Sequence, residues 1–122
     1  MTYGYSTTLA GYARDQRRRG RLERADAAIE LENPVCGDQL RMTARRGPAG
    51  TIAAVRFECQ GCLAAQAAAA ALAEALEGAA LAAAAKLDAA TLARRLDGLP
   101  AAASHAVALA LEARDELLRR LG

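Results

Sequence analysis

The sequence has no tryptophan, and aromatic side chains make up only 3% of its 122 residues. A core must therefore come from Leu, Ala and a few Val and Ile, and 34 of the residues are Ala. Charged residues interrupt the apolar stretches too often for a transmembrane helix, which needs about 20 apolar residues in a row. The first residues lack a basic region followed by an apolar stretch, so we expect no secretory signal, no membrane partner and a cytoplasmic location.

Cysteine is scarce and odd in number, with three residues, and histidine occurs once. These counts exclude the dense disulfide framework of a small secreted domain and leave the thiols available for metal or redox chemistry. The hydrophobic fraction of 53% is too high for a disordered chain. Because domains commonly have about 100–200 residues, we expect residues 1–122 to form a single domain.

The net charge of +2 is unevenly distributed along the chain. Residues 1–24 carry six Arg against Asp15 and Glu23, with the greatest density in Arg17–Arg21. Such a basic N-terminal arm is typical either of a solvated arm or of a patch for nucleic acid or an acidic partner. Aromatic side chains do not alternate with these arginines, as stacking on single-stranded nucleic acid requires. We therefore expect no nucleic-acid partner.

Apolar and polar residues alternate in three runs between about residues 25 and 58, the pattern of half-buried strands. Asn33-Pro34 ends the first run, and residues 46–50, with two Gly and one Pro, form a turn before the third. Because such short connections favour antiparallel pairing, we expect a three-stranded antiparallel sheet with one apolar face. The residues expected on that face are Ala25, Ala27, Ile29, Leu31, Leu40, Met42, Ala44, Ala53, Val55 and Phe57.

Helical patterns follow in about residues 62–77, 80–97 and 100–121. The first is rich in Ala, the best helix former. The second has room for one or two short helices, with Asp88 as a candidate N-cap. Pro100 suits the first position of the last helix. Strands followed by helices predict an α+β fold in which the helices pack on one face of the sheet.

Candidate chemical groups come from three separate segments. Cys36 and Asp38 flank a Gly in the turn between the first two expected strands. Cys62 lies where the first long helix begins, and a helix N-terminus favours an anionic thiolate. His105 lies in the first turns of the last helix, where it is a packed or surface histidine unless these other groups meet it.

Cys59 and Cys62 form a Cys-x-x-Cys pair, which by itself is a weak signal. Cys59 continues the inward parity of the third run, so we expect it in the core if the strand extends that far. Two alternatives remain: Cys59 is a metal ligand, or the pair belongs to a thiol oxidoreductase. A thioredoxin-like parallel crossover needs a dozen or more residues, and residues 25–58 have no room for one. This makes the oxidoreductase the less favoured function.

The segment Asn33-Pro34-Val35-Cys36-Gly37-Asp38 resembles the Cys-Gly-Asp signature of the NifU-like (IscU/SufU-type) iron–sulfur cluster assembly scaffolds. The run from Val55 to Cys62 is similar to a strand of that family that ends in Gly-Cys, and in both a helix of small residues follows. The resemblance covers roughly residues 20–121. The two motifs are specific together and weak apart.

This resemblance implies a small antiparallel sheet with packed helices and a function that is not enzymatic. In the family, a cysteine desulfurase delivers sulfur, iron is bound, and a [2Fe–2S] cluster is built on three Cys with an Asp or His and passed to recipient proteins. For this chain it implies a metal site of Cys36, Asp38, Cys62 and His105, with iron or a transient [2Fe–2S] cluster as cargo, in a monomer or weak dimer. Four such ligands also satisfy tetrahedral zinc, which we expect as a second candidate occupant.

The third ligand cysteine of that family is absent here, because Pro100 is followed by Ala-Ala-Ala-Ser-His-Ala. One alignment places His105 at the position of that cysteine. Another places His105 on a histidine that precedes the cysteine in some members, with Ala106 at the cysteine position. The alternative function is therefore a divergent, zinc-stabilised binding paralogue that no longer assembles clusters.

Overall fold

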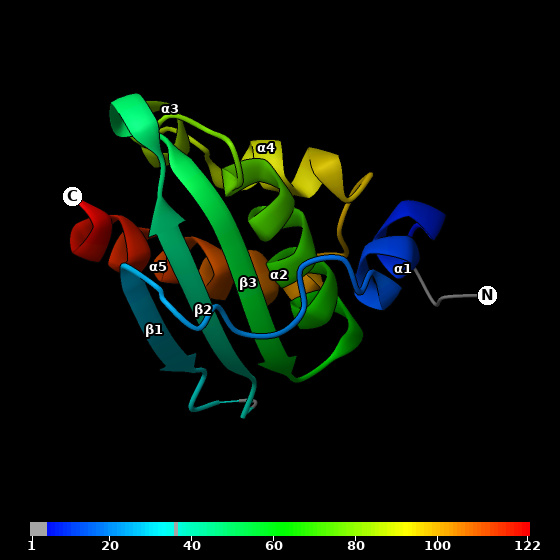
Figure 1. Cartoon of the computed structure of the whole chain (residues 1–122). Helices are drawn as coiled ribbons and strands as arrows, with labels where there is room; N and C mark the ends of the chain where they lie inside the picture. The colour runs from blue at the N-terminus through cyan, green and yellow to red at the C-terminus, as the bar shows by residue number, and fades with distance from the viewer. Residues whose placement is uncertain (1–4, 36) are drawn as a thin grey trace.

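The order of strands and helices follows the sequence-based expectation closely (Figure 1). The computed structural model describes residues 5–35 and 37–122. The strands precede the main helices, which confirms the predicted α+β fold. The elements are α1 (Thr7–Arg14), β1 (Ala27–Glu32), β2 (Gln39–Arg46), the 3-10 turn η1 (Pro48–Gly50), β3 (Ile52–Gln60), α2 (Leu63–Leu76), α3 (Leu81–Ala85), α4 (Ala89–Arg95), the 3-10 turn η2 (Ala101–Ala103) and α5 (Ser104–Leu121).

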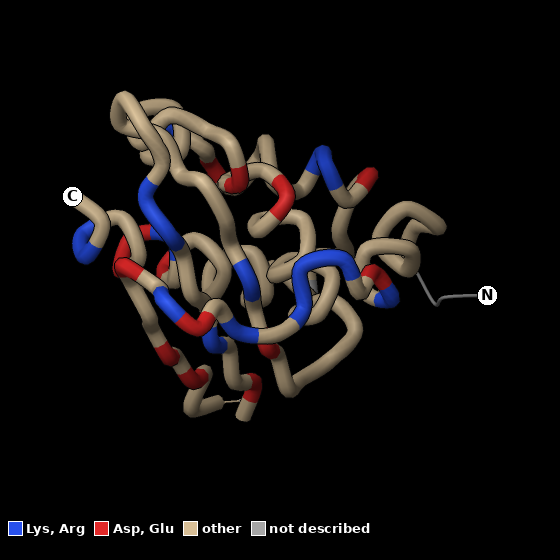
Figure 2. The backbone as a smooth tube through the Cα atoms, viewed as in Figure 1, with Lys and Arg blue, Asp and Glu red and all other residues tan. Residues whose placement is uncertain are grey.

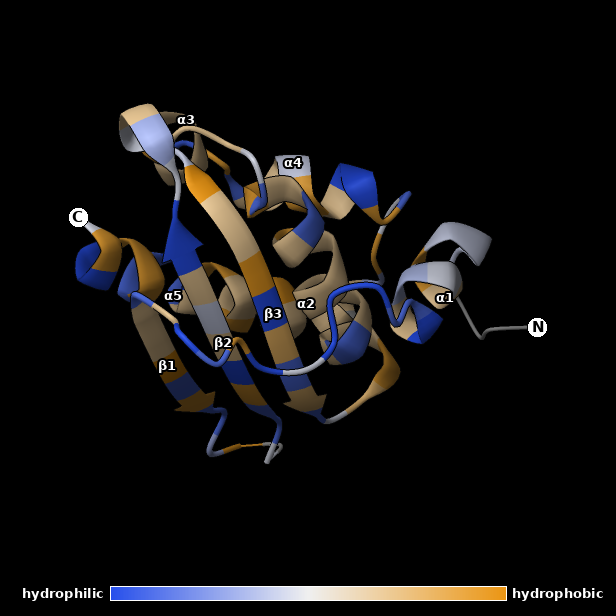
Figure 3. Ribbon diagram, in the orientation of Figure 1, coloured by the Kyte–Doolittle hydropathy of each residue, from blue (hydrophilic) through white to orange (hydrophobic). Residues whose placement is uncertain are grey.

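The three strands form an antiparallel sheet in the order β1-β2-β3. Ile29, Met42 and Phe57 pair across it and are all buried. Figure 3 shows the expected alternation of hydrophilic and hydrophobic residues along the strands. Because side chains alternate between the two faces, the register places one apolar face against the helices.

The expectation that Ala53 faces the core is wrong: Ala53 is exposed, and Ile52 is buried instead. The strand pairing shifts between Arg45 and Arg46, since Arg45 pairs with Ala54 while Arg46 pairs with Ile52. Ala53 is therefore the additional residue of a β-bulge. A bulge reverses the side-chain parity, so simple alternation assigned the start of this strand to the wrong face.

The Ala-rich helix α2 lies beside α5 on one face of the sheet: α2 packs on β3, α5 packs on β1 and β2, and α1 packs on α2 as well. Most of its side chains are buried, including Leu72 and Leu76. Small side chains allow close approach on every side, which explains how one helix contacts so many neighbours in a core with few aromatic residues.

The region expected as one or two short helices contains two, α3 and α4. Asp88 is the N-cap of α4, and its side chain accepts a hydrogen bond of 2.8 Å from the N–H of Thr91. Pro100 does not begin the last α-helix: it precedes η2, and α5 begins at Ser104. Among the described residues, no helix is both long and apolar enough to cross a membrane.

Residues 15–26, which we call the N-terminal strap, lead from α1 across the sheet to β1 (Figure 1). The N–H of Phe57 donates to Arg18 O, and the N–H of Gly20 donates to Phe57 O, each at 2.9 Å. Further along, the N–H of Leu22 donates to Thr43 Oγ1 at 3.0 Å. The strap therefore occupies hydrogen-bonding groups on the outer edge of β3, which would otherwise be open to another chain.

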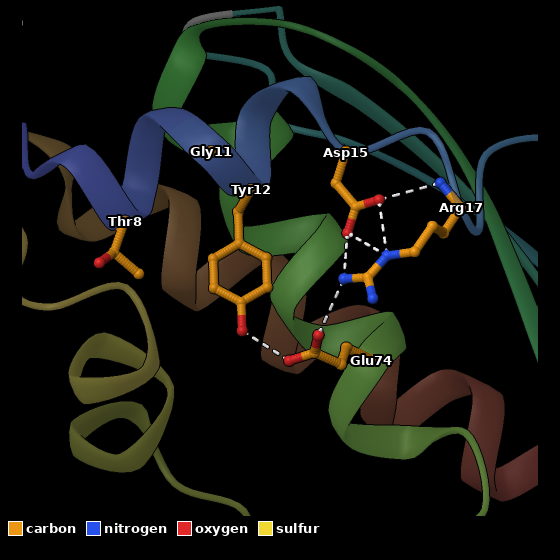
Figure 4. A pocket seen from close by; sticks show the side chains of 6 residues that line it. All are labelled: Thr8, Gly11, Tyr12, Asp15, Arg17 and Glu74. Carbon is orange, nitrogen blue, oxygen red and sulfur yellow. Dashed lines mark hydrogen bonds and ion pairs between the residues drawn. The ribbon is translucent and has the colours of Figure 1, made fainter.

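Arginines of the basic N-terminal segment bind carboxylates within the same chain, and Figure 2 shows basic and acidic positions interspersed. Glu74 of α2 accepts hydrogen bonds from Tyr12 Oη at 2.5 Å, Arg17 Nη2 at 3.2 Å and Arg95 Nη1 at 3.0 Å. Figure 4 shows the first two of these contacts in a cavity of about 420 Å³. Arg17 also holds Asp15 in a forked contact that lowers the pKa of this carboxyl to about 2. These contacts fasten α1 and the strap to α2.

A second carboxylate, Glu77, lies at the C-terminal end of α2. It accepts hydrogen bonds from the N–H of Val55 and from Arg18 and Arg56. Burial raises the pKa of Glu77, but the Val55 hydrogen bond and the two arginines together outweigh burial and leave the pKa below its usual value.

Candidate metal centre

Three of the four expected ligands meet at one end of the sheet. Asp38 lies immediately before β2, Cys62 is the N-cap residue of α2, and His105 lies in the first turn of α5. Their candidate ligand atoms all lie within 4.8 Å of one another. Cys36, the fourth expected ligand, lies outside the described residues.

The carboxylate of Asp38 is at the centre of the group, and the residue as a whole is only 3% exposed. Its Oδ1 accepts a hydrogen bond of 3.1 Å from the N–H of Cys62. Its Oδ2 lies 3.7 Å from Cys62 Sγ and 3.5 Å from His105 Nε2. The Sγ and Nε2 atoms are 3.8 Å apart. One carboxylate oxygen thus binds the backbone N–H of Cys62, and the other faces the Cys62 thiol and the His105 imidazole.

The loop that carries Asp38 is closed by backbone hydrogen bonds. The N–H of Asn33 donates to Asp38 O at 2.8 Å, and the N–H of Gly37 donates to Asn33 O at 2.7 Å. Gly37 has a φ of +76°, in the left-handed region that residues with a Cβ adopt at a cost. This explains the glycine of the Cys-Gly-Asp motif: it allows the tight turn that directs Asp38 toward the helices.

The glycine before Cys62, Gly61, is needed for a different reason. A Cβ on Gly61 would lie 2.4 Å from Asp38 Oδ1 and 2.7 Å from Asp38 Cγ, distances at which atoms overlap. Only glycine leaves room for the carboxylate against the backbone. The Gly-Cys motif and the Cys-Gly-Asp motif are therefore two halves of one contact.

Cys59 belongs to β3, which extends to Gln60, and it packs against the core half-buried. Burial, followed by the nearby charge of Asp38, raises the pKa of the Cys59 thiol to about 11. This placement agrees with a core residue, since a buried thiol with a raised pKa is rarely ionised at neutral pH. Among the described residues, Cys59 is not part of the metal-ligand cluster.

Two of the three candidate ligand residues are accessible to solvent. Cys62 is exposed, and the side chain of His105 is 35% exposed. Two large apolar side chains are exposed close to the motifs in sequence: Val35, before Cys36, at 93%, and Leu63, directly after Cys62, at 40%. A metal or cluster held here has an open route in and out.

Comparison with known proteins identifies the family of this chain. Residues 5–118 match the NifU-like N terminal domain. The chain belongs to this family. The bifunctional protein NifU/MnmA of Rubrobacter xylanophilus is 40% identical to the chain over 85 residues, which are 69% of this chain and 17% of that protein. The chain therefore spans less than a fifth of the length of that relative.

Two solved structures share the fold of this NifU-like domain. A candidate iron–sulfur cluster assembly scaffold protein for the SUF system from Fervidobacterium islandicum has a TM-score of 0.78 at 21% identity, covering 93% of this chain and 96% of that one. The N-terminal part of a nitrogen-fixing NifU-like protein from Brucella abortus has a TM-score of 0.60 at 22% identity, covering 98% and 82%. At these identities the likeness establishes the fold.

Sequence reasoning missed one residue beside the cluster of this NifU-like domain. Gln66, one turn into α2, donates through Nε2 to Cys59 O at 2.8 Å. A signal for it exists, because Gln66 is the only polar residue between Leu63 and Ala73. A lone amide in an apolar helix has to find partners when it is buried, and here one partner lies in the Cys-x-x-Cys loop.

Proposed function

We propose that this chain is a scaffold for iron–sulfur cluster assembly that holds iron or a transient [2Fe–2S] cluster through Cys36, Asp38, Cys62 and His105. The observation that carries the proposal is the convergence of Asp38, Cys62 and His105 from three segments, with ligand atoms within 4.8 Å. Membership of the NifU-like family supports the same function.

The donor types suit a cargo that must be released. Cysteine thiolates bind iron strongly, and the Asp38 carboxylate is a harder, weaker ligand for it. The exposure of Cys62 and His105 allows delivery and transfer without opening the core. A cysteine desulfurase is the proposed source of sulfur, and iron–sulfur recipient proteins are the proposed acceptors.

Zinc is the second candidate occupant, as proposed above for a paralogue that no longer assembles clusters. The observation that favours it is the mixed donor set of thiolate, carboxylate and imidazole, which zinc accepts in one tetrahedral shell. Position 106 carries Ala, 1% exposed, so it supplies no thiol to the site. A site with fewer thiolates loses more affinity for an iron–sulfur cluster than for zinc.

The deciding experiment is anaerobic purification followed by measurement of iron, acid-labile sulfide and zinc. We expect equal amounts of iron and sulfide after reconstitution, and loss of both in Cys62→Ser, Asp38→Ala and His105→Ala. Cys59→Ser is the matched control, since this thiol lies outside the cluster. Zinc with no sulfide after reconstitution would favour the paralogue, and neither metal at the site would refute both proposals.

The thiol oxidoreductase is the weakest of the proposals. It needs one reactive and one resolving thiol, and the raised pKa of Cys59 makes it a poor nucleophile at neutral pH. A thiol–disulfide exchange assay with Cys59→Ser as control tests it. Turnover that depends on Cys59 would revive this function.

A further inference from the structure

Gln66 connects the N-terminal strap to the loop that carries Cys62. Its Nε2 donates to Cys59 O at 2.8 Å, and its Oε1 accepts a hydrogen bond of 2.6 Å from Arg19 Nη1. Its backbone N–H donates to Cys62 O at 3.1 Å, in the first turn of α2. One residue therefore holds both ends of the Cys59–Cys62 loop and is itself held by the strap.

Arg19 is fixed by contacts that leave its guanidinium little freedom. Its Nε donates to Asp15 O at 2.9 Å, and its Nη2 donates to Ala13 O at 2.7 Å. The guanidinium also lies 4.9 Å from the centre of the Phe57 ring, within range of a cation–π contact. A planar, anchored group of this kind can orient the amide of Gln66 more firmly than a mobile side chain can.

We infer that Gln66, oriented by Arg19, is a positioning residue for the metal centre. The inference rests on the proposed metal-binding function. Gln66 touches no ligand atom; it acts by fixing the carbonyl of Cys59, and so the path of the loop that presents the Cys62 thiol to Asp38. The geometry thereby makes the N-terminal strap a support of the site, although none of its residues reaches the metal ligands.

Gln66 can affect the metal site because the carbonyl that it holds, on Cys59, belongs to the same short segment as the ligand Cys62. Cys62 has two other restraints: its N–H bond to Asp38 and the close packing of Gly61 against the same carboxylate. Both lie on the Asp38 side of the loop. At its other end β3 pairs with β2 through Cys59 and Gln60, so loss of the Gln66 contact loosens that end of the loop without freeing it. Metal ligands displaced by a fraction of an ångström lose affinity, and loss of an outer hydrogen-bond partner commonly costs about 10–100-fold.

The test uses Gln66→Glu, which keeps an acceptor for Arg19 but places a carboxylate oxygen against Cys59 O. Zinc affinity is measured by competition with a chromophoric chelator, and the thiolate-to-metal charge-transfer band is read with cobalt(II). We expect zinc binding to weaken about tenfold and the cobalt band to change. Arg19→Ala, which removes the orienting group, should shift both readouts in the same direction by less.

The matched control is Arg18→Ala, at the adjacent strap residue. Arg18 also binds a carboxylate on α2, but its partner Glu77 lies at the opposite end of that helix, about 20 Å from Cys62. Arg18→Ala should leave zinc affinity and the cobalt band unchanged. An equal loss in the Arg18 and Gln66 variants would show general destabilisation and overturn the inference, as would an unchanged Gln66→Glu.

A metal-free readout separates this inference from the proposed function. The N–H of Cys62 donates a hydrogen bond to Asp38. Hydrogen exchange at this amide should accelerate in Gln66→Glu and not in Arg18→Ala. If wild type binds no metal, the proposed function fails and the exchange result still decides whether Gln66 positions the loop: the same rate in both variants overturns it. If Gln66→Glu does not fold, Arg19→Ala provides the same comparison.

Discussion

Replacing Gly61 with Ala introduces one methyl group at the contact that joins the two cysteine motifs. The new Cβ would lie 2.4 Å from Asp38 Oδ1, 2.7 Å from its Cγ and 3.0 Å from its Cβ. Asp38 has a short side chain that is 5% exposed, so it cannot swing aside as the end of a long side chain would. Either the carboxylate or the Gly61–Cys62 backbone has to move.

Both movements break the hydrogen bond between the Cys62 N–H and Asp38 Oδ1, which is 3.1 Å long. A hydrogen bond to a charged group contributes about 1.5–3 kcal/mol, and an additional methyl group in a packed site costs about 1–3 kcal/mol. We therefore expect Gly61→Ala to lower the free energy of unfolding by about 2 kcal/mol or more. Zinc affinity should fall about 10–100-fold, since the carboxylate also faces the other ligands.

Stability is measured by urea unfolding of the metal-free protein under reducing conditions, and zinc affinity by chelator competition. Gly11→Ala is the control: this glycine lies within α1, and a Cβ there meets nothing within 4 Å. Ala at that position should stabilise the protein by about 0.5–1 kcal/mol and leave zinc affinity unchanged. If Gly61→Ala has wild-type stability and wild-type zinc affinity, the close contact between the two motifs is not the basis of the site.

Three further predictions follow from the site and its surroundings. Cys59→Ala should leave zinc affinity unchanged while Cys62→Ala abolishes binding, measured by zinc titration; equal losses would make Cys59 a ligand. A third thiol should raise cluster yield after reconstitution, and we expect this of His105→Cys because the imidazole already reaches Cys62 Sγ at 3.8 Å; a gain only in Ala106→Cys would support the other alignment. Because the folded-state pKa of Glu77 is lowered, its carboxylate adds stability above the unfolded pKa of about 4.3 that is lost as the pH falls through the folded value. Glu77→Gln should therefore be less stable than wild type at about pH 6 and show a smaller acid-induced loss of stability; parallel pH curves would contradict this.

Most of the fold could be predicted from side-chain periodicity alone. The alternation in β1 and β2 and the Ala-rich run of α2 are local patterns, and each indicates a single type of secondary structure. The bulge at Ala53 could not be predicted in this way, because it depends on how Arg46 pairs with a neighbouring strand. Nor did charge density predict the strap, because pairing of Arg18 with Glu77 requires knowledge of which helix end lies beside it.

The candidate site was predictable to a different degree. Spacing placed Cys62 at a helix N-terminus, but no local pattern connects Asp38, Cys62 and His105, which lie on three separate segments. Resemblance to a family supplied that connection. It did not supply the support around the ligands: the fit of Gly61 against Asp38 and the amide contact of Gln66 depend on atomic distances in the folded chain.

The absence of a cysteine from the start of the last helix bears on how His105 acts. His105 Nε2 is 3.5 Å from Asp38 Oδ2 and 3.8 Å from Cys62 Sγ, so the same nitrogen faces both groups. A neutral imidazole can bind a metal through that nitrogen, and it adds no negative charge where a thiolate would. A cluster bound here would then have one negative charge fewer among its ligands than on a three-cysteine scaffold. Substitution of imidazole for thiolate raises the reduction potential of a cluster. We therefore expect a reconstituted cluster in wild type to be reduced at a higher potential than in His105→Cys, measured by redox titration of the visible absorbance. Equal potentials in the two proteins would show that His105 does not bind the cluster.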